Sequence, residues 1–333
     1  MTLRRRPLLA GMFACGLGPA RAETRRFSIA FANLDETPGV MLEGLGFTGA
    51  DVRRSFELAA RSLPVDMRYF DNAGDPDRAV ANAKAAIEAR ADLLIEYNAD
   101  TDANAEIARV LGAAGIPAIA LVDPLPGGAA LYGPDNRAAG QIAGRALGEF
   151  ARDNWADAQV LGVLIGDLAD TGTAIGERVQ GISEGVQALL PGLKFARLDT
   201  GGQPVRADAL LTKFLLTQRG QRMLIATLDD LSAVYARNAI EMNRRQSDCI
   251  IVSQGLDHNI HGGASEKKEI DPNNRGSVVL GSVAYYMDRY GDDVLPLALR
   301  LLAGETLPAR TVTRHRLVTA GTVFREYPPF DMN

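Results

Sequence analysis

Cysteine is nearly absent from this chain, which has two cysteines in 333 residues. Cys15 lies in an N-terminal segment that we expect to be removed, and the one remaining thiol, Cys249, cannot form an internal disulfide. The fold must therefore be held together by its apolar cores. Because Cys249 opens the apolar run Cys249-Ile250-Ile251-Val252, we interpret it as part of a buried strand and not as a nucleophile.

A net positive charge is absent, and aromatic side chains are scarce. The net charge is −5 and the pI is about 5.4, which gives no basis for binding to nucleic acid or to an anionic membrane surface. Aromatic residues make up 6% of the chain, so few rings could stack on a ligand. The content of 47% hydrophobic and 23% charged residues is typical of a globular protein, and 333 residues are enough for two domains.

The first 22 residues have the pattern of a cleaved signal peptide. Arginines at 4–6 precede an apolar stretch at 7–18, and Ala20-Arg21-Ala22 is a small-x-small cleavage site. The apolar stretch is too short to anchor the chain in a membrane. The paired arginines are compatible with a twin-arginine signal, and the bulky Phe13 makes Cys15 a poor lipidation site. We therefore expect a periplasmic protein, exported by either the Sec or the twin-arginine route.

Strand and helix patterns alternate along the rest of the chain. Short apolar runs such as 93–95 and 118–122 are typical of strands covered on both faces, and stretches with helical apolar spacing separate them. The alternation runs from 27 to 132 and begins again at 160. This predicts an α/β protein with two doubly wound, parallel-sheet domains and right-handed crossovers.

The stretch 131–140 connects the two runs. Asp135 and Asn136 are good N-cap residues for the helix that follows, so this turn is expected to cross between the domains. A late strand–helix–strand at 277–318 is expected to cross back, which gives a three-segment hinge with a ligand cleft between the domains. The expected divisions are a signal peptide at 1–22, an N-terminal domain at 25–134 plus about 284–308, a C-terminal domain at 135–282 plus about 310–322, and a tail at 323–333.

Acids, amides and hydroxyls recur where the predicted strands end. In doubly wound folds this edge faces the ligand crevice, and a carboxylate that accepts two hydroxyl hydrogen bonds is suited to a sugar. Some of these acids could instead cap the next helix. For Asp102 and Asp230, helix capping explains the residue at least as well as ligand contact does. The candidates at strand ends, with two aromatic residues near them, are Asn98, Asp100, Asp123, Asp135, Asp167, Asp229, Asp230, Asp257, His258, Tyr132 and Phe47.

Two further patterns would indicate a dinucleotide site or a metal site, but each pattern is incomplete. Gly44-x-Gly46-x-x-Gly49 has the form of a dinucleotide fingerprint, but eleven positions separate it from the end of the first predicted strand. We interpret these glycines as bends in a loop at the cleft edge. His258 and His261, with Asp257, could ligate a metal, although no nearby cysteine or helical glutamate completes the set. Since the sequence also lacks a nucleophile elbow and a phosphate-binding lysine loop, we predict no enzyme, cofactor or metal.

The order and spacing of several motifs resemble the type I periplasmic sugar-binding proteins of ABC transporters, the ribose- and galactose-binding group. The resemblance extends from about residue 26 to 327, and no one motif is specific by itself. The motifs are Gly115-Ile116-Pro117-Ala118-Ile119, Asp135-Asn136-Arg137-Ala138-Ala139-Gly140, Gly172-Thr173-Ala174, Glu177-Arg178-Val179-Gln180-Gly181, Asp229-Asp230, Gly255-Leu256-Asp257 and Gly281-Ser282-Val283-Ala284-Tyr285-Tyr286.

This resemblance implies a monomer that closes on a sugar or polyol and delivers it to a membrane permease. Asp257 matches the family's sugar-binding acid, Asp229 takes the place of an amide that often contacts ligand, and Arg178 matches an arginine of the second domain. The clamping arginine of ribose binders falls on Gly176, and the aromatic pair after the first strand is absent. Asn33, Asp35, Thr171 and Ser282 complete the set of candidate ligand-binding residues.

Two alternatives share much of this evidence. A periplasmic protein that presents its ligand to a chemoreceptor or sensor kinase would have the same fold and cleft. An exported NAD-dependent oxidoreductase would need a bound nicotinamide. Transcription regulators of the lac-repressor type share the fold, but they begin with a helix-turn-helix where this chain has the expected signal peptide.

Overall fold

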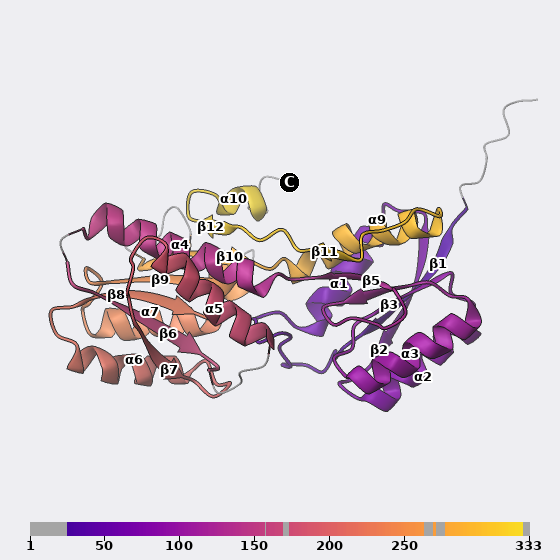
Figure 1. Ribbon diagram of the computed structural model, residues 1–333, viewed down its shortest axis with the longest axis horizontal. Helices are drawn as coiled ribbons and strands as arrows, with labels where there is room; N and C mark the ends of the chain where they lie inside the picture. The colour runs from indigo at the N-terminus through magenta and orange to yellow at the C-terminus, as the bar shows by residue number, and fades with distance from the viewer. Residues whose placement is uncertain (1–24, 157, 169–172, 263–268, 271–276, 329–333) are drawn as a thin grey trace, which may run out of the picture.

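The computed structural model describes residues 25–156, 158–168, 173–262, 269–270 and 277–328. Two six-stranded sheets, each with helices on both faces, form two lobes that lie end to end (Figure 1). The expected α/β class with two doubly wound domains is confirmed, since all strand pairs but one in the described residues are parallel. None of the helices described is long and apolar enough to cross a membrane.

The N-terminal domain is built on the strand order β11-β5-β4-β3-β1-β2. Helices α1 and α9 pack together on one face of this sheet, and α2 and α3 pack together on the other (Figure 1). The elements are β1 Phe27–Asn33, α1 Gly49–Ala60, β2 Val65–Asp71, α2 Pro76–Glu88, β3 Leu93–Glu96, α3 Thr101–Ala114, β4 Ala118–Leu121, β5 Ala130–Gly133, the 3₁₀ turn η1 Met287–Arg289, α9 Tyr290–Leu302 and β11 Arg310–Val312.

The C-terminal domain repeats this plan with the strand order β12-β10-β9-β8-β6-β7. The pair of β10 and β12 is antiparallel. Cys249 is buried at the start of β9, as the sequence predicts. The elements are α4 Asn136–Asn154, β6 Val160–Gly166, α5 Thr173–Gln187, β7 Phe195–Asp199, α6 Arg206–Thr217, β8 Arg222–Thr227, α7 Asp230–Met242, β9 Cys249–Gly255, α8 His258–His261, β10 Val279–Ala284, β12 Leu317–Thr319 and α10 Val323–Glu326.

Three segments cross between the sheets: β5 to α4, β10 to η1, and β11 to β12. The imidazole of His315 joins all three, because its Nε2 accepts from the backbone N–H of Asp135 at 3.0 Å and its Nδ1 lies 2.9 Å from the carbonyl oxygen of Ala284. The first bond makes Nε2 the acceptor and Nδ1 the protonated nitrogen. Burial lowers the pKa of His315, which favours this neutral form.

One expected boundary is corrected by the sheet pairing. We expected the segment from about 310 to 322 to lie in the C-terminal domain. Strand β11, Arg310–Val312, instead pairs with β5 and extends the N-terminal sheet. Only β12 joins the C-terminal sheet, because the third crossing lies between these two short strands. The expected signal peptide at 1–22 lies outside the described residues.

Candidate functional site

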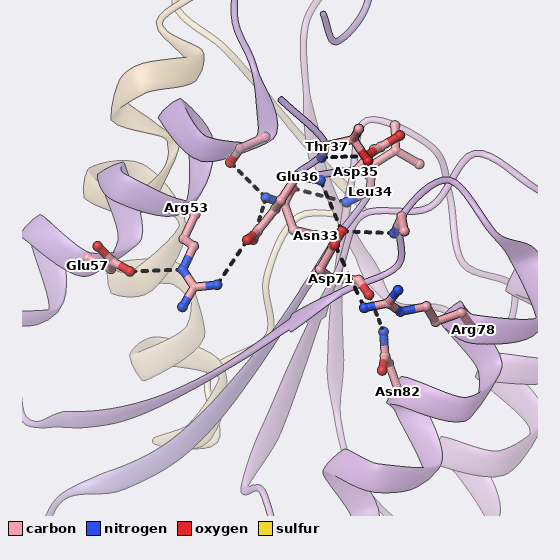
Figure 2. A network of polar contacts seen from close by, with 12 residues as sticks. Asn33, Leu34, Asp35, Glu36, Thr37, Arg53, Glu57, Asp71, Arg78 and Asn82 are labelled. Atoms are coloured by element: carbon pink, nitrogen blue, oxygen red, sulfur yellow. Dashed lines mark hydrogen bonds and ion pairs between the residues drawn. The ribbon is translucent and has the colours of Figure 1, made fainter. Parts of the chain in front are cut away.

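The long segment between β1 and α1 reaches into the space between the domains, and its first residues are fixed by the polar network in Figure 2. The amide of Asn33 donates to Glu36 Oε1 at 3.1 Å and to the carbonyl oxygen of Gly49 at 2.8 Å. The Asp35 carboxylate accepts from the backbone N–H of Thr37 at 2.7 Å. In the described structure these two predicted site residues therefore hold the base of the loop.

The middle of this segment, residues 39–48, forms a compact turn that we call the cleft loop. Leu42, Leu45 and Phe47 are buried in the main core, and the N–H of Leu42 donates to the carbonyl oxygen of Phe47 at 2.8 Å. Glu43 and Gly44 both have positive φ, 57° and 60°, at the tip of the turn. The apolar anchors and the reversed backbone together hold the backbone carbonyl of Glu43 toward the C-terminal domain.

A pocket of about 650 Å³ lies between the cleft loop and the C-terminal domain. This volume is within the usual range for small-molecule sites. Both domains contribute to its walls, as the family resemblance implies for a ligand cleft. The lining residues are Gly39, Met41, Glu43 and Gly44 from the cleft loop, with Asp167, Ala174, Ile175, Arg178, Thr200, Gly202, Pro204, Leu228 and Asp229 from the C-terminal domain.

Arg178 is fully buried and bonds to both domains. Its Nη2 donates to the Glu43 carbonyl oxygen at 3.0 Å, its Nη1 to the Leu228 carbonyl oxygen at 3.3 Å, and its Nε to Asn136 Oδ1 at 3.1 Å. The guanidinium also lies over the ring of Tyr285, with its Cζ 5.1 Å from the ring centroid. All of these partners are neutral, so Arg178 ties the cleft loop to the C-terminal domain without a direct ion pair in the described residues.

The position of Arg178 depends on close packing between α4 and α5. A Cβ at Gly140 would lie 2.2 Å from the carbonyl oxygen of Arg178, and a Cβ at Gly181 would lie 2.1 Å from that of Arg137. Gly144 and Gly185 make similar backbone contacts. These glycines let the two helices approach closely enough for Arg178 to reach Asn136, the first residue of α4.

Asp229 and Asp230 stand together at the start of α7, as their sequence position predicts. Asp229 lines the pocket but also caps α7, since it accepts from the N–H and the Oγ of Ser232 at 2.7 and 2.6 Å. Burial raises the pKa of Asp229 to about 6. Asp230 is fully buried and accepts from Ser253 Oγ, Ser282 Oγ and the N–H of Asp257, so in this structure it organises the strand ends.

Asp257 lies directly beneath the cleft loop. Its Oδ1 accepts from the N–H of Asn259 at 2.7 Å and caps the short helix α8, while its Oδ2 is buried without a hydrogen-bond partner. A Cβ at Gly46 would lie 1.2 Å from that Oδ2, so only glycine permits this approach. Burial raises the pKa of Asp257. The acid that the resemblance assigns to sugar binding is thus covered by the chain itself.

The other predicted site residues divide into those near the cleft and those away from it. Asp167 lines the pocket. Asp123 is half-buried, and its pKa is raised to about 6, first by burial and then by the negative charge of Glu43. Ser282 donates to Asp230 and accepts from the N–H of Leu256 at 2.9 Å, behind the pocket wall.

The remaining candidates have local partners or lie outside the description. Asp100 and Asp135 cap α3 and α4, so helix capping accounts for their position. The others are placed as follows: Asn98 bonds to Asn104, Tyr132 donates to Asp293, Phe47 is in the core, His258 is exposed at the start of α8, and Thr171 lies outside the described residues.

Glu43, which lines the pocket, was missed in the sequence, and so were Tyr285 and Gln254, which are buried behind Arg178. Glu43 Oε1 accepts from the hydroxyl of Tyr97 at 2.8 Å, and Tyr285 donates to Gln254 Oε1 at 2.9 Å. The signal available for Glu43 was an acidic residue beside glycines, in a loop that we assigned to the cleft edge. Gln254 lies inside a wholly buried strand, where the sequence pattern gives no sign of a role.

Neither metal nor nicotinamide binding finds support in this geometry. Among the described residues no three His, Cys, Asp or Glu side chains are grouped so that they could hold a metal ion. The fingerprint glycines belong to the cleft loop and the start of α1. Thr48 and Asp51 close the N-terminus of α1 with a capping box, which places an acid where a pyrophosphate would have to bind.

Residues 39–306 match the family model for the periplasmic binding protein domain, and the chain belongs to this family. Its members are non-catalytic, extracytoplasmic solute-binding proteins. The expected family and the prediction of no enzymatic activity are thereby confirmed. A comparison with curated protein sequences found no match.

Solved structures of sugar- and polyol-binding proteins share the fold at low identity. A Mycobacterium smegmatis protein in complex with β-D-fucofuranose is 18% identical with a TM-score of 0.67, covering 92% of this chain and 95% of that one. The Geobacillus stearothermophilus glucose-galactose-binding protein GanP is 19% identical with a TM-score of 0.61, covering 90% and 99%. A Bacillus halodurans solute-binding protein with bound myo-inositol is 17% identical with a TM-score of 0.61, covering 91% and 97%.

Proposed function

We propose that this protein binds a sugar or polyol between its two domains in the periplasm and delivers it to the permease of an ABC importer. The observation that carries the proposal is the pocket of about 650 Å³ whose walls come from both domains. A ligand that contacts both walls stabilises the closed arrangement, because each contact across the cleft exists only when the domains are together. The three crossing segments are the natural hinge for this motion.

Arg178 and Asp257 are the residues through which ligand binding would act on closure. Arg178 already bonds to the cleft loop and lines the pocket, so a ligand there is in reach of both domains. The buried Oδ2 of Asp257 has no partner, and a hydroxyl group that reached it would supply the missing donor. Such a ligand must first shift Gly46, which covers this oxygen.

A thermal-shift screen of the purified protein against pentoses, hexoses, polyols and cyclitols tests the binding step. A compound present at 100 times its Kd stabilises the folded protein by about 2.7 kcal/mol, which raises the melting temperature measurably. Uptake of the same compound by cells should depend on the gene for this protein. Binding without any effect on uptake would favour presentation of the ligand to a receptor, and no stabiliser in the whole panel would count against sugar and polyol binding.

A further inference from the structure

Negative charge dominates the walls of the pocket. Its ionisable lining residues are Glu43, Asp167, Asp229 and Arg178, three acids against one base. The charges of Arg178 and Asp229 attract each other, since the guanidinium acts to lower the pKa of this buried carboxyl group. Glu43 and Asp167 are then left without a compensating positive charge in the lining.

Neither carboxylate has a direct ion-pair partner in the described structure, although Arg197 and Arg206 bind the carbonyl oxygens of Leu168 and Thr200 close to Asp167. Neither Glu43 nor Asp167 forms an ion pair within 4.0 Å in the described part of the chain. Glu43 accepts one hydrogen bond, from the Tyr97 hydroxyl, and the carboxylate of Asp123 is close enough for mutual repulsion. Because Glu43 belongs to the N-terminal domain and Asp167 to the C-terminal domain, closing the cleft brings like charges together.

The form of the pocket indicates what kind of cation would relieve this repulsion. No three acidic or histidine side chains among the described residues are grouped to hold a metal ion, so an organic cation fits this pocket better than a metal ion does. The described lining contains no aromatic ring, so a sugar ring finds no stacking surface there and polar groups must supply the recognition. Arg178 uses three of its five N–H groups on protein acceptors, and the other two have no protein acceptor in the described residues. Because this side chain is fully buried, a ligand reaches them only where the cleft loop gives way.

We propose that the ligand of this cleft is a sugar or cyclitol that carries a primary amine, with Glu43 and Asp167 binding the ammonium group from opposite domains. This inference rests on the proposed function, because it uses the same pocket and the same closure. Glu43 is then a specificity-determining residue: its carboxylate can accept a hydrogen bond from a hydroxyl group, but only an ammonium group also neutralises its charge.

Calorimetric titration with matched ligands tests the proposal. Glucosamine, galactosamine and an inosamine are each compared with the neutral parent and with the N-acetyl derivative, which keeps the nitrogen but not the charge. We expect an amine to bind at least about tenfold more tightly than both neutral partners, as a charge-assisted hydrogen bond implies. Glu43→Gln and Asp167→Asn should each remove about tenfold of the affinity for the amine. Glu88→Gln, which removes a charge from the exposed end of α2, should leave it unchanged.

The outcomes separate this inference from the proposed function. If a neutral sugar or cyclitol binds as tightly as its amine, the charge argument is wrong and the solute-binding function stands. The same holds if Glu43→Gln and Asp167→Asn both bind the amine as tightly as the unaltered protein does. If no compound of either kind binds, sugar and polyol binding is overturned and the amine inference is overturned with it.

Discussion

Glu96, at the end of β3, is the residue whose substitution tests the electrostatics of this protein most directly. Its side chain is fully buried, Oε1 accepts from Asn72 Nδ2 at 2.9 Å, and Oε2 has no partner. Burial raises the pKa of Glu96 from 4.5 to about 8, because an ionised carboxylate loses its hydration in the core. Folded protein at neutral pH therefore holds a proton on Glu96 that the unfolded chain releases.

This difference makes the free energy of unfolding depend on pH, with a sign that the linkage relation fixes. Between the unfolded pKa of 4.5 and the folded pKa of about 8, the folded state binds one more proton at Glu96 than the unfolded state does. Raising the pH through this window therefore destabilises the folded state by about 1.4 kcal/mol per pH unit. Glu96→Gln cannot titrate, so relative to the unaltered protein it should gain about 2.7 kcal/mol between pH 5.5 and 7.5.

Urea unfolding at pH 5.5, 6.5, 7.5 and 8.5, followed by circular dichroism, measures this gain. The new amide of Glu96→Gln places a donor where Oε2 has no partner, and this costs about 1–3 kcal/mol at every pH. The test is thus the slope of the difference between the two proteins and not its value at one pH. Glu88→Gln, at the exposed end of α2, is the control and should give a flat difference. If the difference in unfolding free energy between Glu96→Gln and the unaltered protein is also independent of pH, Glu96 is not a buried, protonated carboxyl group.

Three further predictions concern the cleft and the hinge. Gly46→Ala should lower the free energy of unfolding by about 1–3 kcal/mol in urea titrations, because the new Cβ would meet Asp257 Oδ2. The control Gly112→Ala on α3, where the Cβ finds open space, should raise the free energy of unfolding by about 0.5–1 kcal/mol. Equal effects of the two substitutions would contradict the close approach of Gly46 to Asp257. His315→Ala should lower the free energy of unfolding by about 1–3 kcal/mol in the same measurement, since it leaves the N–H of Asp135 without its acceptor. A loss no larger than that of a substitution at an exposed residue would contradict the role of His315 in joining the three crossing segments. Glu43→Gln should weaken binding of an amino sugar about tenfold in calorimetry and leave binding of a neutral sugar unchanged.

The alternation of apolar runs was enough to predict the fold class and the hinge, because parallel strands covered on both faces leave a distinct pattern in the sequence. The same pattern placed Asp229 and Asp167 at strand ends, and both line the pocket. Capping is equally local, and Asp135 caps α4 as its sequence context predicts. The capping interpretation of Asp102 and Asp230 was wrong by one or two positions, because the caps of α3 and α7 are Asp100 and Asp229.

The tertiary structure decided which of these polar groups meet. Asp257 and Gly46 lie in different domains and far apart in the sequence. Their contact depends on how Leu42, Leu45 and Phe47 anchor the cleft loop in the core. The same fold brings Glu43 to Arg178, which no local spacing could indicate. Local sequence determines strands, helices and caps because those interactions involve neighbouring residues, whereas the charge balance of the cleft depends on which distant segments pack against each other.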